Sequence, residues 1–241
     1  MDTSTYVALS GQLSLERRMA TLAQNIANAN TNGYRAEVLD FKAVGSITGP
    51  SVTDFALPGG SHIDESLGGM TLTKNPLDIA VRGDGFLGYQ DANGNVTYSR
   101  DGRLTMAPDG RLLNGNGDAL VDAQGSAVTL DPTQPNVAIG GDGTIMQNGV
   151  HKGQVAVYGV DFTGGFTRAQ GAAFIPNKPP AVLTDYNRNG VIQGYIEDSN
   201  VNAATSMTSL IQITRAFEAI SQLSSQAGDA QKSAIETLGS R

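Results

Sequence analysis

The 241-residue sequence contains no cysteine and no tryptophan, and aromatic residues make up only 6% of it. The absence of cysteine excludes disulfides and thiolate metal sites, and it leaves the redox compartment open. The few aromatics, together with 30 glycines, indicate many turns and little core built from large side chains. One large compact domain is therefore not expected.

Positive charge is also scarce, because 16 lysines and arginines face 23 acidic residues, which gives a net charge of −7. Such a chain has no basic surface for phosphates or acidic lipid headgroups, so we expect no nucleic-acid partner. No apolar run approaches the roughly 18 residues of a membrane span, and the segment 1–6 lacks the basic region of a cleaved signal peptide. We expect no membrane insertion, and either a cytoplasmic location or exit by a route without a cleaved signal.

Catalytic patterns are equally sparse. The two histidines, His62 and His151, are isolated in glycine-rich polar surroundings, and the sequence has no H-E-x-x-H, G-x-S-x-G or Walker motif. Carboxylates are numerous but scattered among turns, where aspartate is common for backbone reasons. The sequence therefore predicts no catalytic residues, no cofactor and no metal site, and the protein is not expected to be an enzyme.

Two stretches resemble ligand-binding motifs only in part. Residues 83–88 match G-x-G-x-x-G after a strand, but a turn is predicted next, so no helix N-terminus would hold a pyrophosphate. We interpret them as a glycine-rich hairpin. Residues 185–190 begin like an EF-hand loop, but Ile196 stands at the twelfth position and Arg188 lies inside the loop. A plain Asn-Gly turn is favoured over a calcium site.

The N-terminal segment, about Thr5 to Asn30, has no proline and carries apolar residues at alternating spacings of three and four, which is typical of a coiled-coil seam. Leu9 and Leu13 form a second stripe, and Gly33 is the predicted C-cap. The seam consists of Leu15, Met19, Leu22, Ile26 and Ala29.

The C-terminal segment repeats this pattern over four heptads, with Ser199 or Asn200 as the predicted N-cap. Its seam consists of Leu210, Ile213, Phe217, Ile220, Ser224, Ala227, Gln231, Ala234 and Leu238. Several seam positions are small or polar, so neither helix is expected to be stable alone. Either the two termini pair within one monomer, or they pack against other copies, which the second stripes, including Met207 with Ile211, favour.

Between the helices the apolar pattern changes to a period of two, interrupted by nine Asn-Gly or Asp-Gly pairs that predict hairpin turns. A loose repeat places turn glycines at Gly94, Gly110, Gly125 and Gly143. Residues 41–72 show less pattern and indicate an extended connector or a small strand element.

We therefore expect an α+β fold, in which long N- and C-terminal α-helices form a coiled-coil bundle and a mainly antiparallel β domain is inserted between them. The predicted segments are an N-terminal coiled-coil helix over 1–35, an extended connector over 36–74, a β-rich domain over 75–196, and a C-terminal coiled-coil helix over 197–241. The two helices form the predicted assembly core.

Four blocks in order resemble the flagellar basal-body rod and hook family. Residues 25–35 resemble its signature N-x-A-N-x-x-T-x-G-Y followed by a basic residue, and residues 75–86 resemble the entry into its β domain. Residues 98–104 match a third block. Residues 194–201 resemble the opening of the family's C-terminal helix, and residues 215–219 resemble its R-A-Y/F-x-A heptad. The family-motif residues are Asn25, Asn28, Thr31, Gly33, Tyr34, Asn75, Pro76, Leu77, Asp78, Gly83, Gly85, Phe86, Glu197, Ser199, Asn200 and Val201.

Within this family the short chain favours the proximal-rod members, although Leu87 and Ser99 depart from the usual pattern. The resemblance implies a structural rod subunit whose helices pack in concentric layers with copies of itself and neighbouring rod proteins, transmitting motor torque. The implied assembly interface comprises Leu15, Met19, Leu22, Asn25, Ile26, Asn28, Leu210, Ile213, Phe217, Ile220 and Leu238.

The resemblance also implies contact with the type III export apparatus during secretion, without a cleaved signal peptide, and a final location in the basal-body rod within the periplasm. Two alternatives stay open at this point. One is another axial protein of the same organelle, in the distal rod or hook. The other is a secreted, calcium-dependent β protein that binds or acts on glycans.

Overall fold

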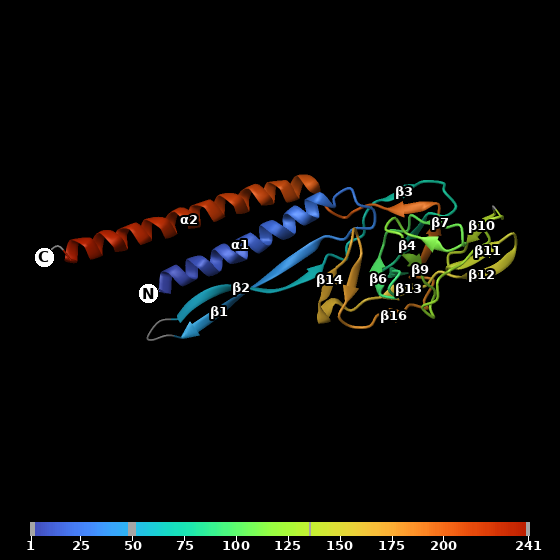
Figure 1. Cartoon of the computed structure of the whole chain (residues 1–241), viewed down its shortest axis with the longest axis horizontal. Helices are drawn as coiled ribbons and strands as arrows, with labels where there is room; N and C mark the ends of the chain where they lie inside the picture. Colours follow the sequence, from blue (N-terminus) through green and yellow to red (C-terminus); the bar gives the residue numbers. More distant parts are fainter. Residues whose placement is uncertain (1–2, 48–51, 135, 240–241) are drawn as a thin grey trace. The chain divides into compact units, whose positions relative to one another are not determined.

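The computed structural model describes residues 3–47, 52–134 and 136–239 (Figure 1). Within these residues the chain divides into two compact units. The helical unit contains the described residues up to Ala27, Glu37–Ser61, and those from Asn202 onward. The β unit contains Asn28–Ala36 and the described part of His62–Val201.

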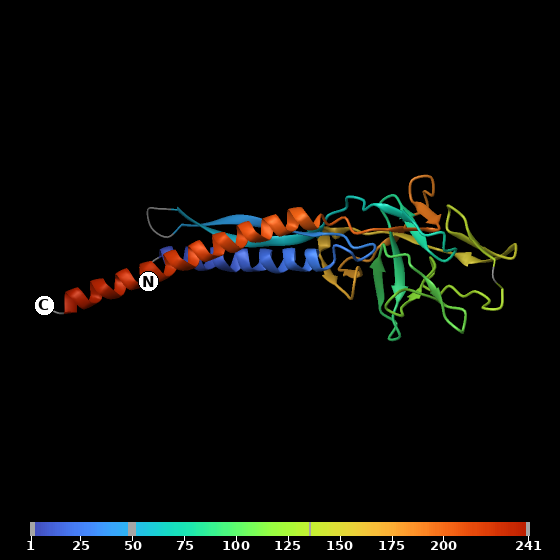
Figure 2. The ribbon, with the colours of Figure 1, turned by 90° about the horizontal axis from the view of Figure 1, so that it is seen from above.

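The helical unit is built on two helices, α1 (Thr3–Ala27) and α2 (Ala203–Gly239), which lie along each other (Figure 2). They run antiparallel, because Gly11 faces the Cδ1 of Ile220 and the Thr214 hydroxyl lies 3.7 Å from the sulfur of Met19. The predicted terminal helices are thus confirmed, and they contact each other within one chain.

The predicted helix ends are wrong at both junctions. Helix α1 ends at Ala27, and Gly33 lies beyond a turn in which the Thr31 amide donates to Asn28, so Gly33 is not its C-cap. Helix α2 begins at Ala203, and its cap is Asn202, whose side-chain oxygen accepts from the Thr205 amide at 3.0 Å. Ser199 and Asn200 lie upstream of the cap.

A β-hairpin completes the helical unit and occupies much of the segment expected to be a connector or small strand element. Strands β1 (Glu37–Ile47) and β2 (Val52–Ile63) form a two-stranded sheet, and β1 contacts α1. Asn25 donates to the Glu37 carbonyl at 2.8 Å and accepts from the Glu37 amide at 3.0 Å. This pair of bonds fixes the start of the hairpin against α1.

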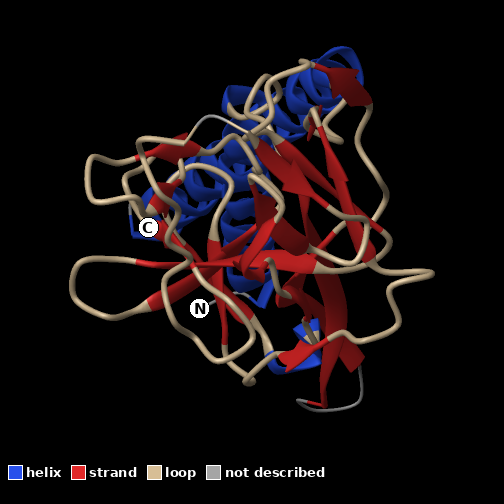
Figure 3. Ribbon diagram, turned by 90° about the vertical axis from the view of Figure 1, so that its right-hand side faces the viewer, coloured by secondary structure: helices blue, strands red, loops and turns tan. Residues whose placement is uncertain are grey.

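The β unit contains several small antiparallel sheets, which confirms the predicted strand orientation (Figure 3). The largest sheet has the order β14-β15-β6-β5-β9-β8-β7, with β13 and β16 joined to it through β5. Strands β10-β11-β12 form a second sheet, and β17-β4 and β18-β3 form two-stranded ones.

The elements of this unit are β3 (Met70–Leu72), β4 (Ile79–Arg82), β5 (Phe86–Gln90), β6 (Val96–Ser99), β7 (Thr105–Met106), β8 (Leu112–Leu113), β9 (Ala119–Leu120), β10 (Val137–Ile139), β11 (Thr144–Gln147), β12 (Val150–Gln154), β13 (Val157–Gly159), the 3-10 helix η1 (Phe162–Gly164), β14 (Phe166–Arg168), β15 (Phe174–Pro176), β16 (Ala181–Val182), β17 (Gly190–Gln193) and β18 (Tyr195–Glu197).

The turn glycines behave as the repeat predicts, since all four have positive φ angles, between 79° and 89°. The prediction of a hairpin over residues 83–88 is wrong. Strand β4 pairs with β17, whereas β5 pairs with β6, β9 and β13, so the glycine-rich turn carries the chain from one sheet to another. A strand follows the turn, as expected, and not a helix.

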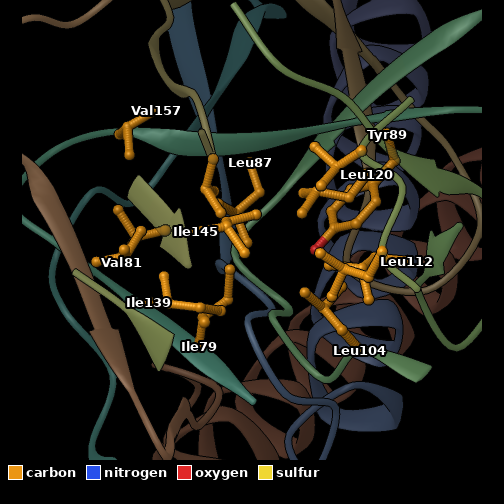
Figure 4. Packing of buried hydrophobic residues seen from close by; sticks show 14 residues of the cluster. Ile79, Val81, Leu87, Tyr89, Leu104, Leu112, Leu120, Ile139, Ile145 and Val157 are labelled. Atoms are coloured by element: carbon orange, nitrogen blue, oxygen red, sulfur yellow. The ribbon is translucent and has the colours of Figure 1, made fainter. Parts of the chain in front are cut away.

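The core of the β unit comprises an aliphatic cluster and an aromatic cluster. Figure 4 shows the first, with Leu87 of β5 lying between Val81 of β4 and Leu120 of β9. The second is built around Phe174, which packs edge-on against Phe86 with ring centroids 4.9 Å apart. Both clusters consist of β-unit residues alone, so this unit has a core of its own.

Tyr89 in the aliphatic cluster is fully buried and donates its hydroxyl proton to the Asp101 carbonyl at 2.6 Å. Burial raises the pKa of Tyr89 well above its ordinary value of 10.0. The stabilisation that results from this raised pKa is fully present below pH 10. It is lost as the pH rises above 10, because the tyrosine of the unfolded chain then releases its proton while Tyr89 of the folded chain keeps it. We expect the free energy of unfolding to fall by about 1.4 kcal/mol per pH unit above pH 10 for this tyrosine.

Urea unfolding at stepwise alkaline pH measures this slope, with phenolate absorbance recording ionisation. In the Tyr89→Phe variant the slope should decrease by the contribution of one tyrosine. An unchanged slope would show that Tyr89 ionises in the folded protein.

Candidate assembly site

The predicted seams of α1 and α2 occupy the same antiparallel helix pair. Leu15, Met19, Leu22 and Ile26 on α1 are half-buried, and Ile213 on α2 is only 6% exposed. Leu210, Phe217 and Ile220 are half-buried as well. Both predicted faces therefore have apolar surface left to cover, and their role as an interface between subunits stays a prediction.

Leu238 is 78% exposed, because α2 is longer than α1. Gly11 faces Ile220, and the helices are antiparallel. Thr3, which is eight residues before Gly11, therefore lies level with about residue 228 of α2. The last ten or so residues of α2 consequently extend past the start of α1, as Figures 1 and 2 both show. This overhang has no intrachain helix beside it within the described residues.

The second stripes are more exposed than the seams. On α1, Leu9 and Leu13 are 49% and 52% exposed, and on α2 Met207 and Ile211 are 50% and 55% exposed. An apolar side chain left in water loses roughly 1.5–3 kcal/mol relative to full burial. These stripes are therefore surfaces on which association would be favourable.

The family-motif residues have a different role, since many of them meet in one buried network of the β unit. The Glu197 carboxylate, 1% exposed, forms ion pairs with Arg35 at 2.6 Å and with Arg100 at 2.5 Å. The three residues come from different motif blocks and are brought together by long-range folding. A buried carboxylate between two guanidiniums accepts charge-assisted hydrogen bonds, which offset the cost of burying the three side chains.

Arg100 also explains the glycine-rich turn after β4. Its guanidinium donates to the carbonyls of Val81, Gly83 and Gly85 at 2.7–2.8 Å. One side chain thus donates to three backbone carbonyls, at the end of β4 and in the turn that follows it. Arg100, which was not among the predicted site residues, determines the path of this motif.

Arg35 lies in a less favourable electrostatic environment than Arg100's other partners provide for Arg100. Burial and the neighbouring Arg100 charge lower the pKa of Arg35 to about 10, while Glu197 opposes the shift. Arg35 remains protonated at neutral pH and donates to the Glu65 carbonyl at 3.0 Å. Its positive charge therefore depends on Glu197 for compensation.

Asn200 forms a second part of the network, which we call the clamp. Its amide group donates to the carbonyls of Asp64 and Ser66, both at 3.0 Å, and its oxygen accepts from the Ala36 amide at 2.7 Å. Its backbone amide donates to Tyr34 at 3.2 Å. One asparagine thus joins three stretches of chain, 34–36, 64–66 and 197–201.

Tyr34 lies in the same region and is fully buried. The Arg168 guanidinium lies 4.6 Å from its ring centroid and donates to the Arg35 carbonyl at 2.6 Å. Gly33 precedes it with φ 67°, and its amide donates to the Glu197 carbonyl at 2.7 Å. The end of the first motif is therefore docked on the fourth.

The remaining motif residues stabilise local turns. Asn75 donates to the Asp78 carboxylate at 2.9 Å, and its oxygen accepts from the Leu77 amide. The Ser199 hydroxyl accepts from the Val201 amide, and Asn28 accepts from the Thr31 hydroxyl. Pro76 contributes its carbonyl to Gln193 at 2.7 Å. Phe86 belongs to the aromatic cluster.

Within the described ranges no group of three or more His, Asp or Glu side chains is arranged to hold a metal ion. The loop that begins like an EF-hand closes as a turn, with the Asn189 amide donating to the Asp185 carbonyl at 2.8 Å. His62 and His151 are exposed. In the same part of the chain, neither helix is apolar enough over sufficient length to cross a bilayer.

Three family models match the chain. Residues 6–35 match the flagella basal body rod protein model, residues 80–147 the flagellar hook protein FlgE/F/G D1 domain, and residues 192–237 the flagellar basal body rod FlgEFG protein C-terminal model. The matches cover both helices and much of the β unit.

Full-length relatives agree with these models. The flagellar basal-body rod protein FlgF of Mesorhizobium japonicum is 38% identical over 241 residues, covering all of both chains, and that of Escherichia coli is 30% identical over 254 aligned positions, covering 96% and 98%. FlgG of Buchnera aphidicola subsp. Schizaphis graminum is 25% identical, covering 90% and 93%. The chain therefore belongs to the flagellar basal-body rod proteins of the FlgE/F/G family, and within it to the FlgF type, a structural rod subunit and not an enzyme.

Proposed function

We propose that this rod subunit assembles through α1 and α2, whose outward faces pack against copies of itself and neighbouring rod proteins. Torque from the motor then passes to hook and filament through packed helices. The observation that carries the proposal is that apolar side chains on both helices, Leu13 and Ile211 among them, remain about half exposed in the single chain.

The incomplete burial of the seams supports this assignment. Among the predicted seam residues whose burial is described, Ile213 alone is buried, and the others remain at least partly accessible to solvent. A helix pair of this kind gains stability from further helices packed around it. The β unit has its own core and does not depend on that packing.

We further propose that the chain is exported unfolded through the flagellar type III apparatus and assembles in the periplasm. A chain without cysteine is suited to this route, because it forms no wrong disulfides in an oxidising compartment. Assembly after export would then complete the burial that the single chain lacks.

A negative charge in the seam tests the assembly proposal. Ile213→Asp is expected to abolish motility and intact basal bodies, because an unpaired buried charge costs several kcal/mol, about as much as a marginal seam contributes. The charge would separate α1 from α2, and the outward faces of the pair would lose the arrangement in which they pack against other subunits. Ile26→Asp on α1 should act in the same way. Soft-agar swimming and electron microscopy of purified basal bodies measure the outcome.

The matched control is Gln212→Asp, which places the same charge on the adjacent, exposed position and should leave motility unchanged. Near-ultraviolet circular dichroism of the purified Ile213→Asp chain should retain the signal of the β unit. Normal swimming of both Asp variants in the seam, with intact basal bodies, would contradict the proposal.

A further inference from the structure

Helix α1 presents three faces, and two of them are used within the chain. One contacts α2, through positions such as Gly11 and Met19, and a second contacts the β1–β2 hairpin, to which Asn25 is bonded. The third face carries Leu9 and Leu13, which are about half exposed and which we call the outer stripe. At 100° per residue it lies roughly 140° around the helix from the seam.

Helix α2 has an exposed apolar face of its own. Met207 and Ile211 are one turn apart, and we call them the outer patch. They lie roughly 125° around α2 from the seam that includes Ile213 and Phe217. This face is therefore not turned toward the chain's own α1.

The outer stripe and the outer patch lie at different levels of the helix pair. Gly11 faces Ile220 and Met19 contacts Thr214, so Leu9 is level with about residue 223 of its own chain. Ile211 is about 12 residues away from that level, which is about 18 Å at 1.5 Å per residue. The two apolar surfaces of one chain cannot cover each other, although they can meet between chains.

We propose that the outer stripe of one copy docks on the outer patch of a second copy, with Leu9 against Ile211 and Leu13 against Met207. The inference rests on the proposed function, and it adds that the copies point the same way along the rod. The α1 of one copy then lies antiparallel to the α2 of the next, in the orientation that it already has toward its own α2.

The position of a charged residue supports a second copy as the docking partner. In the proposed register Glu16, which is exposed on α1, reaches the first turn of the neighbour's α2. A helix N-terminus carries partial positive charge, so a carboxylate is favourable there. The contact joins two different surfaces, so it repeats from copy to copy with an axial stagger of about 18 Å and does not close into a dimer.

Disulfide crosslinking tests the register directly, because the chain contains no cysteine. Two differently tagged copies, one Leu9→Cys and the other Ile211→Cys, are produced together in cells that lack the native gene, and basal bodies are oxidised and isolated. A crosslinked pair that carries both tags is expected in the isolated basal bodies. The matched control replaces Ile211→Cys by Leu223→Cys, which is just as exposed but should not meet Leu9 of another copy.

Crosslinks between two Leu9→Cys copies would overturn the proposal, since they report a symmetric contact. Equal crosslinking with Leu223→Cys, or none with Ile211→Cys in intact basal bodies, would also overturn it. Each of these results leaves the proposed function standing if Ile213→Asp still abolishes assembly. Assembly that survives the seam charges would instead overturn the proposed function.

Discussion

Replacing Glu197 with alanine is expected to lower the free energy of unfolding of the β unit by about 3–5 kcal/mol. The carboxylate is 1% exposed and compensates both Arg35 and Arg100, which are themselves buried. Without it two guanidiniums face each other with no anion between them. The charged form of Arg35 is destabilised most, because burial and the charge of Arg100 already lower the pKa of Arg35.

Tyrosine fluorescence during urea unfolding reports this change, because six of the seven tyrosines belong to the β unit. Glu197→Gln should be destabilising as well, since it keeps the shape but removes the charge. The matched control is Asp161→Asn, which breaks the exposed ion pair with Lys178 and should change stability little. Equal unfolding midpoints for Glu197→Ala and the control would contradict the proposed role of the network.

Replacing Gly33, the one glycine of the first motif, with alanine is expected to destabilise the β unit through two separate effects. Its φ of 67° is unfavourable for alanine by about 1–2 kcal/mol. In addition, the new methyl group would lie 2.1 Å from the backbone nitrogen of Asp101. Backbone must move to relieve this contact, which adds about 1–3 kcal/mol.

Gly94→Ala separates the two effects, because Gly94 has a φ of 89° but no atom within 4 Å of the added methyl group. It should show the conformational cost alone. Urea unfolding of both variants, followed by tyrosine fluorescence, measures the difference. If both lose the same stability, the close packing of Gly33 against Asp101 has no energetic role.

The terminal helices were predictable because a heptad pattern is local, and seam residues such as Leu22 and Phe217 report it directly. The hairpin of β1 and β2 was only partly predictable, since its apolar residues do not follow a regular period of two. The turn glycines, Gly94 for example, were correctly predicted, because an Asn-Gly pair determines its own backbone geometry.

The wrong prediction of the α2 cap shows that a local sequence pattern carries no information about long-range hydrogen bonds. Asn200 satisfies every local rule for a helix cap, yet its amide is engaged by residues more than 130 positions away in the sequence. Asn202 performs the capping instead. Long-range bonds thus decided between two similar residues two positions apart.

The buried network was missed for a related reason. Arg35 is the one charged residue of its motif block, and Arg100 shares its block with Asp101 and Arg103. An arginine in a sequence usually indicates an exposed position. Only the fold brings both to Glu197. Both arginines lie within the family motif blocks, which marks them as candidates, but the motifs do not indicate which acidic residue they pair with.

The clamp at Asn200 has a mechanical consequence. The chain crosses between the two units four times, and the segments at three of these crossings, near Ala36, Asp64 and Asn200, are linked by hydrogen bonds from the Asn200 side chain. A pull on any one of these three segments is therefore resisted by hydrogen bonds to the other two. A tensile or twisting load on one segment is in this way shared among all three.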